Sequence, residues 1–133
     1  MKPLKASDIM VRPVVSARTN ASARDIALQL LNGLYSGMPV TDDQGHVIGV
    51  VTEFDLLEAA QAGKELVKTT AEEIMTTEVI TADADTLVSE LIKIMTDKKV
   101  ICVPITAKGK LVGVVARCDV LKTMMLPEFV TYA

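Results

Sequence analysis

The sequence predicts a mixed α/β (α+β) protein made of two β-α-β-β-α repeats that pack pseudo-symmetrically, sheet to sheet. Three observations predict this fold: an internal repeat, the same order of helix-like and strand-like runs in both copies, and an aliphatic composition. The chain has 133 residues, of which 50% are hydrophobic and only 3% aromatic. This length matches one ordinary domain, and the apolar content is sufficient for a buried core.

The internal repeat has an offset of 65 residues that drops to 64 in the second half of each copy. The matched segments are Ile9-Met10 with Ile74-Met75, Val14–Ala17 with Val79–Ala82, Met38–Thr41 with Val103–Thr106, Gly49–Val51 with Gly113–Val115, and Asp55–Leu57 with Asp119–Leu121. The offset changes where Asp42-Asp43-Gln44 becomes Ala107-Lys108, a polar stretch between two apolar runs. A deletion there predicts a loop, because a one-residue slip inside a strand would turn its core face to solvent.

Each copy is predicted to begin with a helix tip and to continue with the same five elements. In the first copy these are a tip at 7–10, a short strand at 14–16, a helix with Ile26, Ala27, Leu30, Leu31 and Leu34 at helical spacing, strands at 38–41 and 47–52, and a final helix with Leu56, Leu57 and Ala60. In the second copy they are a tip at 71–75, a strand at 79–81, a helix with Leu91, Ile92 and Met95, strands at 101–106 and 111–116, and a final helix with Val120, Leu121, Met124 and Met125. Ser22 and Asp85 are predicted N-caps, and Asp83 a turn residue.

The predicted boundaries follow the repeat. Residues 1–62 form the first copy, 63–70 a linker with Gly63 and Lys64, and 71–133 the second copy. A two-stranded ribbon with a helix cannot bury both of its faces alone, so the two copies are expected to form one module. We expect their sheets to face each other and to leave clefts between the copies.

Composition and charge exclude several classes of function. The net charge is −3 and the 14 basic residues are spread along the chain, so the basic face and stacking aromatics of a nucleic-acid-binding protein are absent. One histidine, His46, and no nucleophile paired with a base argue against an enzyme or a metal site. A mean hydropathy of +0.35 predicts an apolar surface patch and hence a homodimer. The predicted contact residues are in the last helices, at Leu56, Leu57, Leu121, Met124 and Met125.

The sequence also predicts a cytoplasmic location. No apolar run approaches the roughly 20 residues that span a bilayer, and residues 1–8 lack the apolar stretch of a signal peptide. Cys102 and Cys118 are too few for a disulfide scaffold and lack metal-site spacing, so we expect reduced thiols.

The candidate functional site lies where each last strand enters the last helix, at Gly49–Asp55 and Gly113–Asp119. A helix N-terminus favours an anion such as phosphate, and an aspartate one turn later can accept hydrogen bonds from a ribose diol. Thr52 and Asp55 also fit a capping box, which needs no ligand. In the second copy Ala116 cannot cap, yet Asp119 is kept, and this suggests a separate role for the acid.

This layout resembles CBS domains, named after cystathionine β-synthase, of which two tandem copies form a Bateman module. The resemblance rests on the duplicated Ile-Met segment, the strand with Met/Val-Pro-Val/Ile, and the Gly-x-x-Thr-x-x-Asp ending, and it covers residues 8–60 and 73–126. It implies that AMP, ADP, ATP or S-adenosylmethionine binds as a regulatory ligand in clefts between the copies. The motif aspartate would then hold the ribose hydroxyls, and the Ser or Thr three residues earlier would meet phosphate.

The resemblance implies two clefts that differ in composition. The first would contain Thr52, Asp55, Thr76, Val79, Ile80, Ile101 and Cys102. The second would contain Val14, Val15, Tyr35, Ser36, Gly37, Arg117 and Asp119. Ala116 departs from the family pattern, and Arg117 is expected either to supply charge for a phosphate or to be a solvated surface residue.

The expected function is therefore that of a non-catalytic sensor whose packing changes when an adenine nucleotide or S-adenosylmethionine binds. The alternative is an interaction module without a ligand, acting through homodimerisation or an unidentified protein partner. A stand-alone module does not reveal which protein it regulates.

Overall fold

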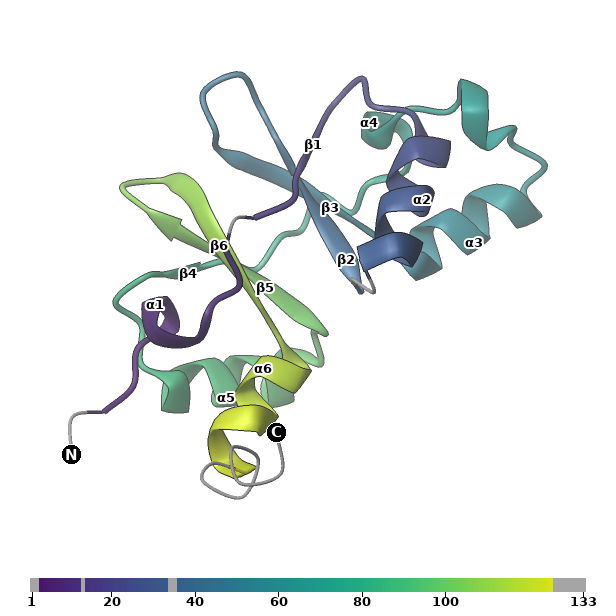
Figure 1. Ribbon diagram of the computed structural model, residues 1–133. Coiled ribbons are helices and arrows are strands. Elements are labelled where there is room, and N and C mark those ends of the chain that lie inside the picture. The colour runs from purple at the N-terminus through teal and green to yellow at the C-terminus, as the bar shows by residue number, and fades with distance from the viewer. Residues whose placement is uncertain (1–2, 13, 34–35, 126–133) are drawn as a thin grey trace. The chain divides into compact units, whose positions relative to one another are not determined.

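The computed structural model describes residues 3–12, 14–33 and 36–125. These residues form two compact units, each with its own three-stranded sheet and core (Figure 1). Unit 1 contains the described parts of segments 1–14, 81–107 and 112–125, and unit 2 contains 15–33, 36–80 and 108–111. The predicted mixed α/β fold, with a sheet from each copy, is confirmed.

Unit 2 is built on a sheet with the strand order β1-β2-β3. Its elements are β1 (Ala17–Arg18), α2 (Ala23–Gly33), β2 (Gly37–Thr41), β3 (Val47–Thr52), α3 (Glu53–Gln61), the 3-10 helix η1 (Leu66–Lys68) and α4 (Ala71–Ile74). β1 is parallel to β2, and β2 is antiparallel to β3. Figure 1 shows α2 and α3 next to each other beside this sheet.

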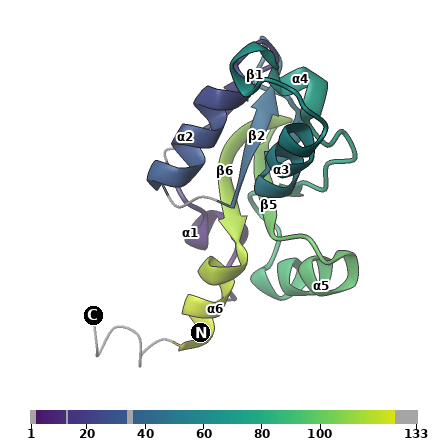
Figure 2. The same ribbon diagram turned by 90° about the vertical axis from the view of Figure 1, so that its right-hand side faces the viewer.

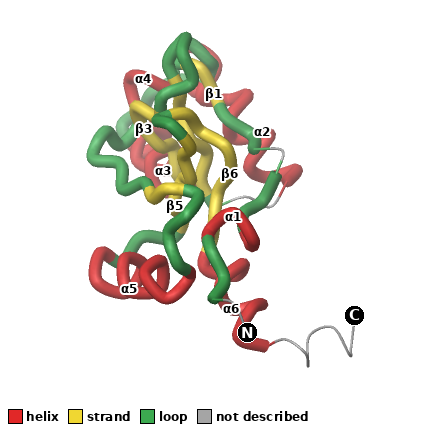
Figure 3. The backbone as a smooth tube through the Cα atoms, turned by 90° about the vertical axis from the view of Figure 1, so that its left-hand side faces the viewer, coloured by secondary structure: helices red, strands yellow, loops and turns green. Residues whose placement is uncertain are grey.

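Unit 1 repeats this arrangement with the strand order β4-β5-β6. Its elements are α1 (Ala6–Ile9), β4 (Ala82–Asp83), α5 (Val88–Lys98), β5 (Cys102–Ala107), β6 (Lys110–Ala116) and α6 (Arg117–Met125). The first two residues of β6, Lys110 and Leu111, are grouped with unit 2. A tight turn joins β5 to β6, with φ of 53° at Lys108 and 79° at Gly109, as a primed hairpin turn requires. Figures 2 and 3 both show α1 beside the end of β6 and the start of α6.

The compact units do not coincide with the sequence repeats, because the two short N-terminal helices are exchanged. α1 comes from the first repeat, yet Ala6 is fully buried in the core of unit 1 together with Leu91, Val103 and Val115. α4 comes from the second repeat, and Ala71 is fully buried in the core of unit 2. Each repeat therefore contributes one helix to the core of the other.

The core positions follow from the strand and helix periodicity. β2 is buried along Met38–Thr41, as expected for the central strand of a sheet covered on both faces. On α2, Ile26 and Leu30 are buried and Ala27 is partly buried; on α5, Leu91 and Met95 are buried and Ile92 is partly buried. The helical spacing identified these positions correctly. Leu31 is an exception, with 67% of its surface exposed, and Leu34 lies outside the described residues.

The structure corrects the predicted position of the short strands. They lie at Ala17–Arg18 and Ala82–Asp83 rather than at 14–16 and 79–81. The β-branched residues indicated an extended segment, but a strand needs a partner, and pairing begins only where Ala17 meets Val40 and Ala82 meets Ile105. The tertiary register therefore decided the strand bounds.

The predicted caps have different outcomes. Ser22 is confirmed, since its Oγ accepts a hydrogen bond of 3.0 Å from the backbone N of Asp25. Asp85 does not cap α5: the N-cap is Leu87, without a side-chain bond, and the Asp85 carboxylate instead forms an ion pair with Lys5. Asp83 is the last residue of β4 and begins the turn that follows: its Oδ2 accepts a hydrogen bond of 2.9 Å from the backbone N of Asp85.

The end of the first repeat shows one departure from expectation. The segment 63–70, predicted as the linker between the copies, contains the 3-10 helix η1. Leu56, predicted at a dimer surface, is 9% exposed and packs in the core of unit 2. No described helix has the length and apolar character needed to cross a membrane.

Candidate functional site

The Asp55 carboxylate lies at the junction of β3 and α3 in unit 2. Thr52 is the N-cap of α3, and its Oγ accepts a hydrogen bond of 3.2 Å from the Asp55 backbone N. In return Asp55 Oδ2 accepts bonds from Thr52 N at 2.8 Å and Thr52 Oγ at 3.1 Å. The capping box expected as the ligand-free alternative is therefore present. Only 9% of the Asp55 surface is exposed.

Thr76 contributes a further hydrogen bond from the other repeat. Its Oγ donates to Asp55 Oδ1 at 3.1 Å, with Oδ2 at 3.4 Å. An antiparallel bridge holds Thr76 in place, with Thr76 N donating to Val50 O at 2.9 Å and Val50 N donating to Thr76 O at 3.0 Å. The structure thus joins three predicted site residues, Thr52, Asp55 and Thr76, within one compact unit.

A glycine allows this bridge to form. A Cβ atom at Gly49 would lie 2.8 Å from the Met75 Cγ, closer than side chains pack. The absence of a side chain at Gly49 lets Met75 lie on the strand, and Thr76 follows directly. The Gly-x-x-Thr-x-x-Asp motif and the Ile-Met motif of the other repeat are therefore parts of one packing arrangement.

The matching place in unit 1 has the same backbone but different side chains. Asp119 Oδ2 accepts a bond of 2.7 Å from Ala116 N, and Val11 N donates to Val114 O at 2.9 Å. Val11 and Ala116 stand where unit 2 has Thr76 and Thr52, so both hydroxyls are replaced by aliphatic groups. Among the described residues, the one side chain that contacts the Asp119 carboxylate is that of Cys118, whose Sγ lies 4.0 Å from Oδ1.

This geometry weakens one argument from the sequence. Asp119 was interpreted as an acid kept without its capping partner. It still satisfies the backbone N–H of Ala116 at the start of α6, which is half of a capping box. The retention of Asp119 is therefore explained structurally, and a binding role for it needs other support.

The remaining predicted residues of the first cleft divide between the two units. Val79 and Ile80 are partly buried in unit 2, whereas Ile101 and Cys102 belong to unit 1. Ile101 O accepts a bond of 3.2 Å from Arg117 N. Burial raises the pKa of the Cys102 thiol to about 11. The thiol is therefore uncharged at neutral pH. The grouping of these residues in one cleft stays a prediction.

The predicted residues of the second cleft are also divided. Val14, Arg117 and Asp119 belong to unit 1, and Val15, Ser36 and Gly37 belong to unit 2. Gly37 begins β2 and pairs with Thr52. Tyr35 lies outside the described residues. This cleft, too, stays a prediction.

Arg12 follows Val11 and is exposed, and the repeat offset matches it to Thr77.

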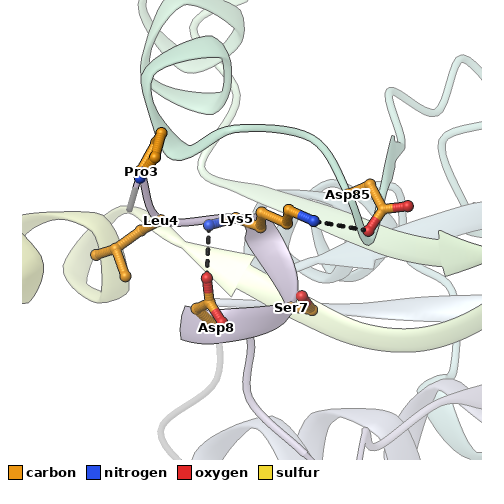
Figure 4. A pocket seen from close by; sticks show the side chains of 6 residues that line it. All are labelled: Pro3, Leu4, Lys5, Ser7, Asp8 and Asp85. Atoms are coloured by element: carbon orange, nitrogen blue, oxygen red, sulfur yellow. Dashed lines mark hydrogen bonds and ion pairs between the residues drawn. The ribbon is translucent and has the colours of Figure 1, made fainter. Parts of the chain in front are cut away.

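A shallow pocket elsewhere in unit 1 contains none of the residues predicted for the two clefts (Figure 4). It has a volume of about 470 Å³ and is lined by Pro3, Leu4, Lys5, Ser7, Asp8 and Asp85. Its charged groups already have partners: the Lys5 backbone N donates to Asp8 Oδ2 at 2.8 Å, and Lys5 Nζ lies 3.6 Å from Asp85 Oδ1. Within the described residues, no group of three or more His, Cys, Asp or Glu side chains could hold a metal ion.

Both halves of the chain match one protein family. The CBS domain matches residues 6–62 and again residues 71–126. The chain therefore belongs to the CBS domain family and carries two tandem copies of the domain.

Two relatives of known sequence are longer than this chain. An uncharacterized protein of Methanopyrus kandleri is 29% identical over 124 residues, covering 92% of this chain and 63% of the relative. L-aspartate semialdehyde sulfurtransferase of Methanocaldococcus jannaschii is 30% identical over 125 residues, covering 90% of this chain and 24% of the relative. The chain thus spans less than two thirds of the length of either relative.

Solved structures share the fold. The CBS domain pair of protein MJ0100, crystallised in complex with 5′-methylthioadenosine and S-adenosyl-L-methionine, superposes with a TM-score of 0.83 at 28% identity, over 92% of this chain and 97% of that one. A protein from Vibrio cholerae described as a putative acetoin utilization protein gives a TM-score of 0.87 at 24% identity, over 99% and 98% of the two chains, and supports the fold alone.

Proposed function

We propose that this chain is a non-catalytic sensor module that binds an adenine nucleotide (AMP, ADP or ATP) or S-adenosylmethionine as a regulatory ligand. The observation that carries the proposal is the assembly of Thr52, Asp55 and Thr76 within unit 2. These residues come from two sequence motifs 20 or more positions apart, and hydrogen bonds of 3.1 to 3.2 Å join them. The complex of the MJ0100 CBS pair with two adenosyl compounds supports the class of ligand.

The Asp55 carboxylate can accept a hydrogen bond from a ribose hydroxyl. A carboxylate offers about four lone-pair positions, and the Thr52 amide and the two threonine hydroxyls occupy three of them. Oδ1 accepts its one short bond from Thr76 and keeps a further position for a ligand hydroxyl. The carboxylate is held by its capping role, so a ligand would meet a group already fixed in place.

Calorimetric titration of the intact chain with AMP, ADP, ATP and S-adenosylmethionine tests this proposal. We expect at least one ligand to bind, and Asp55→Asn to abolish binding at this site. Asparagine keeps the shape and one capping acceptor but loses the charge and an acceptor oxygen. Asp25→Asn is the matched control, because Asp25 is an exposed acid in the first turn of α2. No response to any of the four ligands at millimolar concentration would refute the proposal.

The second candidate function is an interaction scaffold without a ligand. The capping box favours it, since Thr52 and Asp55 satisfy each other with no ligand involved. Light scattering with and without AMP or S-adenosylmethionine separates the two functions. A scaffold keeps one mass and one hydrodynamic radius in both conditions, whereas a sensor changes its packing or stability when the ligand binds.

A further inference from the structure

The turn between β2 and β3 contains the single histidine of the chain. His46 Nδ1 lies 3.4 Å from Asp42 Oδ2, and Asp42 Oδ1 accepts hydrogen bonds of 2.9 Å from the backbone N of Gln44 and of His46. Arg18 of β1 also binds this turn, because its guanidinium donates to Asp42 O at 2.9 Å and lies 3.2 Å from the Asp43 carboxylate. Residues 42–46, which we call the acidic turn, are therefore fixed by contacts of their own.

The turn between β5 and β6 contacts the acidic turn within unit 2. Leu111 N donates a hydrogen bond of 3.0 Å to Gly45 O. The Lys110 side chain lies over Gly45, where an added Cβ atom would be 3.8 Å from Lys110 Cγ. The His46 ring lies over Gly109 in the same way, with its Cδ2 3.5 Å from the place of a Cβ atom. The two turns thus share one backbone hydrogen bond and two side-chain contacts.

The second turn, residues 108–111, carries charge opposite to that of the acidic turn, and we call it the basic turn. It contains Lys108 and Lys110, whereas the acidic turn contains Asp42 and Asp43. The backbone N–H of His46 holds the pKa of the Asp42 carboxyl below its ordinary value, so this carboxylate stays charged in mild acid. The His46 side chain is 46% exposed, and histidines change charge between about pH 5 and pH 8. Among the described groups of the two turns, His46 is therefore the one that titrates near neutral pH.

Protonation of His46 has two opposing electrostatic effects. It strengthens the pair with Asp42, but both residues belong to the acidic turn, so this gain exists whether or not the two turns are in contact. It also adds positive charge against the turn that contains Lys108 and Lys110, and this repulsion exists only while the turns are in contact. The repulsion therefore decides how protonation changes the strength of the contact.

We propose that the contact between the acidic turn and the basic turn is a pH-sensitive switch, formed while His46 is neutral and weakened when His46 is protonated. The contact is then fully formed in mildly alkaline solution and is weakened as the pH falls through the range in which histidine titrates. Residues 108–111 belong to unit 2, and the chain on either side of them belongs to unit 1. The switch therefore controls how firmly the turn of the β5-β6 hairpin is held in unit 2.

Hydrogen exchange at the Leu111 amide measures this contact, because this N–H donates to Gly45 O. Protection factors, corrected for the intrinsic exchange rate, are compared at about pH 5.5 and about pH 7.5 in the intact chain. We expect protection to be about threefold lower at the acid pH, the scale of an exposed charge pair. The Thr76 amide, which donates to Val50 O in the same unit, is the internal control and should keep its protection.

Substitutions at the exposed charges separate the two electrostatic effects. His46→Gln is uncharged at every pH and should abolish the pH dependence, whereas His46→Lys is permanently charged and should give low protection at both pH values. The combined Lys108→Gln and Lys110→Gln variant removes the repulsion, so its protection should not change with pH. Lys64→Gln is the matched control, because Lys64 is an exposed lysine of unit 2 outside both turns.

Three results would overturn the proposal. Equal protection of the Leu111 amide at both pH values in the wild-type chain would show that His46 does not control the contact. Higher protection at the acid pH would mean that the pair with Asp42 dominates. A pH dependence that persists in His46→Gln would assign the effect to another group. All of these measurements are made without nucleotide, so their outcome is independent of the proposed ligand-binding function.

Discussion

Met75 lies directly over Gly49, and Met10 lies over Gly113 in the same way. A Cβ atom at Gly49 would be 2.8 Å from the Met75 Cγ, and one at Gly113 would be 2.7 Å from the Met10 Cγ. Each methionine comes from one repeat and each glycine from the other, so the exchange of the short helices depends on two equivalent glycine-methionine contacts. The contact in unit 2 also positions Thr76 beside Asp55.

Gly49→Ala is expected to destabilise the chain by about 1–3 kcal/mol, because the added methyl group overpacks the contact with Met75. Adding Met75→Ala should recover part of this loss, with a coupling energy of about 1 kcal/mol or more in a urea-denaturation cycle. Met10→Ala is the matched control, since Met10 packs on Gly113. The combination of Gly49→Ala with Met10→Ala should be additive within about 0.5 kcal/mol. Equal coupling in both pairs would contradict the pairing of glycines and methionines.

Thr76→Val should cost about 1 kcal/mol of unfolding free energy, because it removes the hydroxyl that donates to Asp55 while keeping the side-chain shape. Thr77→Val is the control: Thr77 is the exposed neighbour, and no described hydrogen bond involves its hydroxyl. Chemical denaturation of the two variants measures the difference. A loss of similar size in both would mean that the Asp55 bond contributes nothing specific.

Burial of Cys102 predicts a loss of stability at alkaline pH. Its pKa is raised from 9.0 to about 11 in the folded chain, so the folded state keeps the thiol proton where the unfolded chain has released it. The contribution of this protonated thiol to the free energy of unfolding is fully present below pH 9. It is lost as the pH rises towards 11, and the loss is on the order of 2 kcal/mol. Urea denaturation across this range measures it. Cys102→Ala removes this pH-dependent loss, and an identical pH profile in that variant would contradict the assignment.

The homodimer predicted from the sequence can be tested on the last helix of each repeat, α3 and α6. Leu57 and Leu121 are 68% and 58% exposed, at matched positions on α3 and α6. We expect a dimeric mass in sedimentation at tens of micromolar, and a monomeric mass for the combined Leu57→Glu and Leu121→Glu variant, because charged groups are depleted at the core of interfaces. Leu31→Glu is the control, since Leu31 is 67% exposed on α2. A monomeric wild-type chain, or equal effects of the variants, would refute this interface.

The sequence by itself determined the repeat, the order of elements and most of the core. Periodicity identified Ile26, Leu30, Leu91 and Met95 as core positions, because a helix that covers a sheet must present one apolar face to it. The change of offset correctly indicated a loop between the two strands of each hairpin. The motif also gave Thr52 and Asp55 as neighbours, since positions three residues apart lie on the same turn of a helix end.

Only the tertiary structure decided which repeat each short helix joins, and where the short strands begin. A four-residue helix such as α1 or α4 carries too few apolar positions to specify its partner, so packing on a distant glycine selects it. The strands begin at Ala17 and Ala82 because pairing needs a neighbouring strand in register. The Asp55 to Thr76 bond depends on both effects: its residues are 21 positions apart, and no local pattern brings them together.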